Sequence, residues 1–340
     1  MYLVPQSEIK IGNMRFFGGN TGINAVEIDT SVKKLVSTAK ITLPANFKNS
    51  EGKKITELMH VGDKAEIRLG YNGKLETEFT GYVNRISATT PLVVELENAW
   101  FAYKRKPPLN QNWKSTSLHE ILAFAFPGLE IECPDVNLTN YLIKQATPYE
   151  IANRIQGELG FCTHIDEEKQ KLLCFLPYEY SEYRTHTYVF GTRKPEGLEE
   201  LKRRRLSPNI AKNSLEFTSR DDLKLQVTGK TKDAAGKSIQ YTHGSTDENA
   251  TKRTRNYGSD VTTMEDLKVR TIADYDKWNF DGFTGKITGF GTPAVRAGDC
   301  LQLVDVDHPE REGKYLVEAV KITYGIKGGF RRENTLSYRI

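Results

Sequence analysis

The sequence lacks the side-chain patterns on which most enzymes and metal proteins depend. Its 6 histidines never stand three to five residues apart, so the usual helical zinc spacing is absent. It contains neither a Gly-x-Ser-x-Gly elbow nor a phosphate-binding P-loop. Gly285, Gly289 and Gly291 stand in the wrong order for a dinucleotide-binding loop, and a strand pattern surrounds them. We therefore expect these glycines to relieve the backbone at a bend of a barrel.

Cysteine and long apolar runs are also scarce. The 340 residues include 4 cysteines, none in a Cys-x-x-Cys pair. Each stands in an apolar or strand-like context, where free cysteine behaves as a small hydrophobe. We expect reduced structural thiols in a cytoplasmic product. No basic and apolar leader opens the sequence, and no apolar run approaches the roughly 20 residues that span a bilayer, so no membrane anchoring is expected.

The small net charge does not indicate a nucleic-acid-binding protein. The net charge of +4 is small for 340 residues, whereas nucleic-acid binders usually carry a larger and clustered excess of basic residues. With 38% apolar and 10% aromatic residues the chain can still bury sizeable cores. Its length suits two or three domains.

The sequence does contain a hairpin pattern written twice. Each copy has a Gly-Asp turn, an alternating strand, a polar turn and a second strand that opens on Gly and Tyr. The copies comprise residues 61–69 with 79–86, and residues 297–304 with 313–320. We expect Glu66–Leu69 and Leu301–Val304 to occupy equivalent places in two related barrels, with the differences confined to the loops.

The pattern along the chain predicts a mainly β fold with α+β insertions. Short alternating runs broken by Gly, Asn and Pro indicate strands near both ends, and Lys104–Pro108 has the composition of a boundary. We predict two related antiparallel β-barrel domains and a small α+β module. The ranges are 1–101 for a first, tube-like barrel, 102–178 for the module, and 179–340 for the second barrel, with a hairpin-plus-helix insertion at about 214–279.

Four helices are expected from local signals. Ser117 with Glu120, and Thr147 with Glu150, have the spacing of capping boxes. Apolar residues follow each cap at helical spacing, and Gly160 is placed to end the second of these helices. The ranges are 54–59, 117–126, 147–160 and 264–278. The polar stretch 244–259 is expected to be a loop.

Two charged clusters are candidate sites. Asp305, Asp307 and His308, with Glu310, could hold a divalent cation, but a polar hairpin loop is the favoured interpretation. The basic run Lys202–Arg205 follows several glutamates, which favours a solvated loop or a protein contact over a phosphate site. Carboxylates for glycoside hydrolysis can come from distant positions, and nothing selects a pair. We assign no catalytic, cofactor-binding or metal-binding residue and no cofactor.

The order of parts resembles a known family. Each stretch that resembles the family is a weak signal by itself, and only the order of the stretches is specific. They are Thr147–Phe161, Asn213–Val227, Phe280–Asp299 and Tyr315–Arg331. Together they resemble the late-control protein D family of phage tail baseplate hub proteins, which is similar to the N-terminal hub part of type VI secretion spikes.

The resemblance implies a homotrimer whose two barrels per subunit form a pseudo-six-fold ring. That ring adapts a six-fold tail tube to a three-fold spike. The implied partners are the tail tube protein, the spike protein and other baseplate or tape-measure proteins. DNA would pass through the lumen without specific binding. The implied location is the virion tail baseplate, assembled in the bacterial host cytoplasm. Because the sequence ends at Ile340, we expect the spike to be a separate chain.

Two other functions stay open. A tail-tip cell-wall hydrolase would need a cleft with carboxylates or a metal, for which the sequence offers only the loop at Asp305–Glu310. A carbohydrate- or receptor-binding β-protein is compatible with the 10% aromatic content.

Overall fold

The structure is a computed structural model that describes residues 3–18, 23–44, 52–87, 89–176, 184–220, 223–233, 235–258, 261–325 and 328–340. It divides into two compact units. The first unit comprises Met1–Phe101, Tyr183–Ser214 and Gly285–Leu336. The second comprises Ala102–Glu182, Leu215–Thr284 and Ser337–Ile340.

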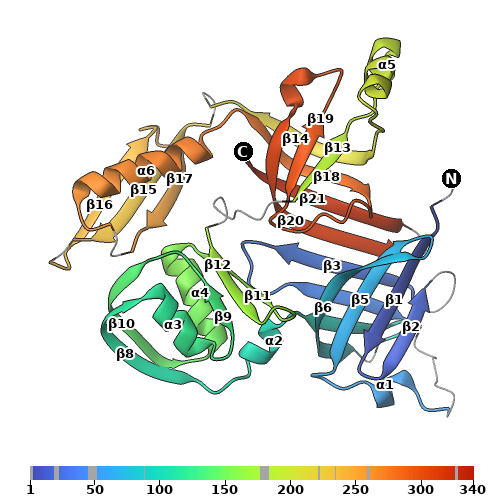
Figure 1. Cartoon of the computed structure of the whole chain (residues 1–340), viewed down its shortest axis with the longest axis horizontal. Coiled ribbons are helices and arrows are strands. Elements are labelled where there is room, and N and C mark those ends of the chain that lie inside the picture. Colours follow the sequence, from blue (N-terminus) through green and yellow to red (C-terminus); the bar gives the residue numbers. More distant parts are fainter. Residues whose placement is uncertain are drawn as a thin grey trace. The chain divides into compact units, whose positions relative to one another are not determined.

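The first unit is built on one large sheet to which both ends of the chain contribute (Figure 1). Its first-half strands are β1 (Pro5–Ile11), β2 (Met14–Gly18), β3 (Ala25–Ser31), β4 (Thr38–Leu43), β5 (Lys64–Tyr71), β6 (Lys74–Ser87) and β7 (Leu92–Glu97). Its second-half strands are β13 (Thr185–Val189), β14 (Ile210–Thr218), β18 (Gly282–Phe290), β19 (Cys300–Val304), β20 (Gly313–Gly325) and β21 (Gly329–Arg339). Short helices α1 (Ile55–Leu58), α2 (Trp100–Tyr103) and α5 (Pro195–Arg203) and the 3₁₀ turn η1 (Pro309–Arg311) join them.

The sheet joins the two halves through β3 and β20. Of its 13 strands, all but β13 and β19 follow the order β14-β18-β21-β20-β3-β4-β7-β6-β5-β1-β2, and β19 pairs with both β20 and β13 beside this path. Figure 1 shows blue β3 next to red β20. Alternate residues of each strand face the core; in β7 they are Leu92, Val94 and Leu96, all at most 2% exposed. This alternation is the period of two that a strand imposes on its side chains.

The second unit combines three small sheets with three helices. Strands β8 (Leu109–Ser117) and β10 (Asn137–Ala146) form one sheet, and β9 (Glu130–Glu132), β11 (Cys162–Asp166) and β12 (Lys171–Phe175) form another. The third contains β15 (Leu225–Lys232), β16 (Ser238–Gly244) and β17 (Thr251–Asn256). The helices are α3 (Leu118–Ala125), α4 (Pro148–Leu159) and α6 (Met264–Trp278), the last packed on β15 and β16.

The local helix signals are confirmed. Ser117 and Glu120 form a capping box at α3, and Thr147 and Glu150 form one at α4. Gly160 ends α4 with a φ of 73°, a left-handed conformation that glycine adopts without strain. Helices α1 and α6 lie within the other two predicted ranges. No helix within the described ranges is both long enough and apolar enough to cross a membrane.

Two elements were predicted wrongly as loops. The basic run Lys202–Arg205 begins inside α5, which has no side-chain cap and holds its charges by ion pairs from Glu200 to Arg203 and Arg204. The stretch 244–259 contains β17, which is hydrophilic and mostly exposed. Neither element carries the apolar period on which the sequence prediction relied.

The mainly β fold class is confirmed. Where the described residues give the register of a strand pair in the large sheet, the pair is antiparallel, apart from the parallel pair β13 and β19. The division into three domains stays a prediction. Its boundary at 178/179 lies outside the described residues, as do Asp221 and Asp222 of the family-like stretch.

Candidate functional site

The repeated Gly-Asp turn is built in the same way in both halves of the chain. In the first copy Gly62 has a φ of 97° and donates its N–H to the carbonyl of Val83 at 2.8 Å. Val83 donates back to the carbonyl of Asp63 at 2.9 Å. The Asp63 carboxylate accepts from the N–H of His60 at 2.8 Å. The carboxylate thus closes a turn whose backbone needs glycine.

The second copy repeats these bonds. Gly298 has a φ of 96° and donates to the carbonyl of Val317 at 2.8 Å. Val317 donates to the carbonyl of Asp299 at 2.8 Å, and the Asp299 carboxylate accepts from the N–H of Arg296 at 2.8 Å. The two hairpins therefore share one local structure.

The hydrogen bonds also correct the expected alignment by one residue. Because Val83 and Val317 occupy the same place, Tyr82 corresponds to Leu316 and not to Tyr315. On the first strand of each hairpin, Ala65–Arg68 matches Leu301–Val304, whereas the sequence pattern suggested Glu66–Leu69. A slip of one residue moves every side chain to the other face of a strand. An alignment based on matching Gly and Tyr residues therefore predicts the wrong face, whereas the backbone hydrogen bonds give the correct register.

The second turn is tied to a neighbouring strand by charge. Asp299 is 7% exposed at its side chain, and its carboxylate lies 3.1 Å from Arg184 and 2.9 Å from Nε2 of His186. Burial alone raises the pKa of Asp299, but the His186 and Arg184 contacts, with the Arg296 N–H, outweigh it and lower that pKa. The extra contacts fix the turn to β13.

The neighbours of the two hairpins differ in direction. In the first copy β5 pairs with β1 in antiparallel fashion, whereas in the second copy β19 pairs with β13 in parallel. On the other side β6 pairs with β7, and β20 pairs with β3 from the first half of the chain. The two copies are therefore alike at the turn and distinct around it.

A buried polar cluster joins the two halves inside the first unit. The hydroxyl of Tyr71 on β5 donates to the carbonyl of Phe330 at 2.8 Å and accepts from the N–H of Gly291 at 3.1 Å. A Cβ placed on Gly291 would lie 2.1 Å from the Phe330 ring. Gly291 therefore allows a close approach of backbone to ring, and Gly285 takes a φ of 112°.

Arg332 anchors the same cluster. Its side chain is 1% exposed, pairs with Glu78 at 2.5 Å and donates to the carbonyls of Gly291 and Val295. Burial raises the pKa of Glu78, although the Arg332 charge acts against that rise. Local sequence patterns do not reveal this cluster, because its members lie far apart in the chain and only the charge of Arg332 inside an alternating strand signals it.

The acidic loop holds its carboxylates apart. Asp305 accepts from the N–H groups of Asp307 and His308 at 3.2 and 3.1 Å, and it faces Arg311 at 3.5 Å. Asp307 instead accepts from the Thr192 hydroxyl at 2.9 Å. Among the described side chains no group of His, Cys, Asp and Glu is placed to hold a metal ion. This geometry agrees with the polar-loop interpretation.

Neither the basic run nor the cysteines form a reactive centre in the described structure. Arg204 contacts Glu200 at 2.7 Å and Glu312 at 3.2 Å. None of the 4 cysteines, all within the described ranges, forms a disulfide, and burial raises the pKa of the Cys133 thiol to about 11, which keeps it protonated.

In the part of the chain that the structure describes, the large sheet ends in three strands. Strands β2 and β14 end the strand order, where β2 pairs with β1 alone, and β13 beside that order pairs with β19 alone. Phe17 on β2 is 64% exposed. An edge strand offers unpaired N–H and C=O groups to another chain.

No protein-family model matches the sequence, and no curated protein matches it. Solved structures do. A tail protein from Neisseria meningitidis MC58 is 13% identical with a TM-score of 0.67, covering 99% of this chain and 96% of its own. A 43 kDa tail protein of prophage MuSo2 from Shewanella oneidensis is 14% identical with a TM-score of 0.63, covering 98% of each.

A third match is an E. coli component of the type VI secretion system, described as structurally similar to tail proteins of bacteriophage T4. It is 10% identical with a TM-score of 0.55, covering 97% of this chain and 76% of its own. At these identities the matches establish the fold: the chain is similar to two phage-type tail proteins and to a type VI secretion component along nearly its whole length. The resemblance seen in the sequence is confirmed at that level.

Proposed function

We propose that the chain is a structural hub of a phage tail or related injection device. It acts as a homotrimer whose repeated hairpins build a pseudo-six-fold ring between a hexameric tail tube and a trimeric spike. The observation that carries this proposal is the equivalence of the turns at Gly62 and Gly298, which share the two backbone bonds to the second strand and the bond that closes the turn at the aspartate carboxylate. Three subunits with two equivalent hairpins each present six similar elements.

The open edges supply a route to the ring. A cyclic oligomer can remove unpaired strand edges by pairing them between subunits. In this proposal β2 of one subunit meets an edge strand of the next. Further partners are the tube protein, the spike and other baseplate or tape-measure proteins. DNA passes through the lumen without specific binding, in keeping with the net charge of +4.

The differences around the turns serve the three-fold partner. A tube protein needs six similar contacts, whereas a spike needs three and must tell the two hairpins apart. The antiparallel β1 beside one hairpin and the parallel β13 beside the other provide such a difference. The proposed domains 1–101 and 179–340 then act as two half-subunits of the ring, with 102–178 as an appended module. The site of action is the virion tail baseplate, after assembly in the host cytoplasm.

The proposed role is non-enzymatic, and the contacts of the acidic loop support it. Asp305 and Asp307, the residues that a hydrolase reading would use, bind different partners. Replacing both by asparagine leaves peptidoglycan release unchanged if the role is structural. A loss of release in a variant that keeps its oligomeric mass would favour the tail-tip hydrolase, and glycan binding by the isolated chain would favour a receptor-binding protein.

Light scattering on the purified chain tests the hub. A mass near three times 38.5 kDa is expected for the chain alone. If the chain trimerises only with the spike protein, the complex should contain three copies of the chain. The variant Phe17→Asp places a charge on the exposed face of β2 and should lower the trimer fraction. Phe290→Asp, on a strand paired inside the sheet order, is the matched control and should lower the trimer fraction less. A monomer in both conditions overturns the proposal.

A further inference from the structure

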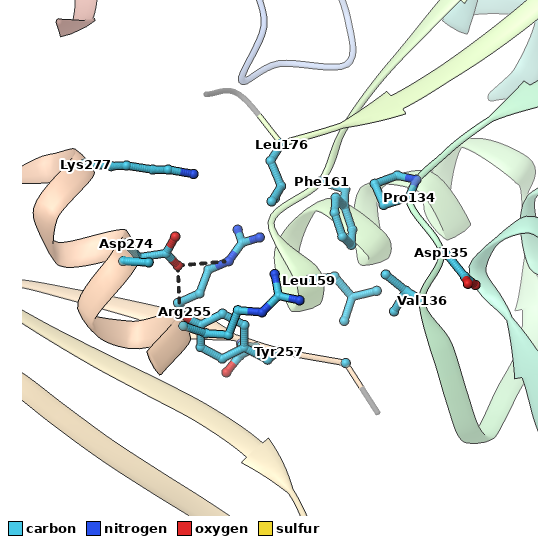
Figure 2. Close-up of a pocket in the computed structure, with 14 residues that line it drawn as sticks. Pro134, Asp135, Val136, Leu159, Phe161, Leu176, Arg255, Tyr257, Asp274 and Lys277 are labelled. Carbon is cyan, nitrogen blue, oxygen red and sulfur yellow. Dashed lines mark hydrogen bonds and ion pairs between the residues drawn. The ribbon is translucent and has the colours of Figure 1, made fainter. Parts of the chain in front are cut away.

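The second unit contains a cavity of about 220 Å³ that the proposed function does not use (Figure 2). Residues from α4, β17 and α6 and from the segments next to them line it. The apolar wall includes Val136, Leu159, Phe161 and Leu176. The charged wall includes Arg255, Arg270 and Lys277, with Asp135 and Asp274.

Arg255 is the buried cation of this cavity. Its side chain is only 10% exposed. A Cβ at Gly160 would lie 2.2 Å from the guanidinium, so the glycine that ends α4 also makes room for it. In Figure 2 the guanidinium lies between Asp274 and Phe161.

The guanidinium is incompletely paired. Its Nε is buried without a hydrogen-bond partner among the described residues. The carboxylate of Asp274 lies 3.7 Å from that Nε, which is beyond hydrogen-bond distance. A buried donor left without an acceptor costs on the order of 1–3 kcal/mol, so an arriving acceptor would gain from it.

Asp274 is already engaged by another donor. The hydroxyl of Tyr257 donates to its carboxylate at 2.8 Å. Burial, and then the charge of Asp274, raise the pKa of Tyr257. The phenol therefore stays a neutral donor. Three cations against two carboxylates leave the lining with one positive charge in excess (3 − 2).

We propose that this cavity binds a carboxylate on a short apolar stem, as the C-terminal residue of a partner polypeptide carries. Small-molecule sites usually measure roughly 300–1,000 Å³, so this volume suits one residue and not a nucleotide or a sugar chain. The apolar wall takes the stem, and Arg255 takes the carboxylate, since a guanidinium matches that group in charge and geometry. Chain-terminal carboxylates are a recurring recognition target.

Calorimetric titration of the full chain tests this site. The probes are 3-phenylpropionate and its neutral amide. The acid should bind and the amide should bind at least tenfold more weakly, and added salt should weaken only the acid. Lys277→Gln and Arg270→Gln, both on the exposed side of α6, should each weaken the acid severalfold. Lys237→Gln, an exposed lysine of the same unit outside the lining, is the matched control.

Arg255→Met should abolish acid binding, with its thermal transition as the check of folding. If that variant does not fold, the two α6 variants decide. N-acetyl-leucine and the α-amide of N-acetyl-glutamate distinguish a chain terminus from an acidic side chain; the former should bind more tightly. Equal binding of acid and amide, no binding of either, or equal effects of Lys277→Gln and Lys237→Gln would overturn the proposal.

Discussion

Arg332 on β21 lies 2.5 Å from the carboxylate of Glu78 on β6, and this buried ion pair joins positions 254 residues apart. Both side chains are at most 5% exposed. The guanidinium also donates to the carbonyls of Gly291 and Val295. The pair therefore connects the two halves of the first unit at its centre, beside the ring of Phe330.

Arg332→Met should lower the free energy of unfolding by about 3–5 kcal/mol, because it leaves the Glu78 carboxylate buried and unpaired. Adding Glu78→Gln should restore part of that loss. Urea unfolding measures both. Lys286→Met is the control, since Lys286 pairs with Glu333 on the same sheet with half of its side chain exposed and should cost less than about 1 kcal/mol. Equal losses for Arg332→Met and Lys286→Met would contradict the assignment.

Gly291→Ala should destabilise the first unit by about 1–3 kcal/mol, the usual cost of overpacking a core. The added methyl group would lie 2.1 Å from the Phe330 ring, which cannot move without disturbing Tyr71. Gly328→Ala meets nothing within 4 Å and serves as the control. Thermal unfolding compares the two, and a Gly291→Ala variant as stable as Gly328→Ala would exclude the close approach.

Local signals in the sequence predicted local structure well. Ser117 and Glu120 lie three residues apart, and a capping box needs nothing else. Helix α5 escaped prediction because Lys194 supplies no side-chain cap and only Gly197 and Leu201 are buried. Its charged side chains form pairs within the helix that the sequence alone could equally place on a loop.

Non-local structure was harder to predict. The repeated letters revealed the two hairpins, but their register follows from hydrogen bonds at Val83 and Val317 that lie across a turn of variable length. The cavity around Arg255 was missed altogether, because β17 has no apolar alternation and Gly160 is distant in sequence. In a strand without apolar alternation, a single sequence does not show which charged residues the fold buries.

Gly62→Ala and Gly298→Ala should each cost about 1–3 kcal/mol, the usual range for a residue forced into a sparsely populated backbone conformation. Their φ values of 97° and 96° are nearly equal. The two losses should therefore agree within about 1 kcal/mol if the turns are equivalent, within the usual scatter of such measurements. Denaturant unfolding under one set of conditions measures both. A large loss at one turn and none at the other would refute the equivalence.

The stability of the first unit should depend on pH through the ionisation of the Asp299 carboxylate. Its pKa is lowered in the folded chain from an ordinary value of 3.8. The contribution of this carboxylate is thus fully present above that value and is lost as the pH falls through the lower folded pKa. His186→Gln removes a contact that helps to lower the pKa, so the variant should lose less stability between neutral and strongly acidic solution. Urea unfolding at pH steps below 5 measures the slopes. Parallel slopes for the variant and the parent chain would show that His186 does not stabilise the charged form of Asp299.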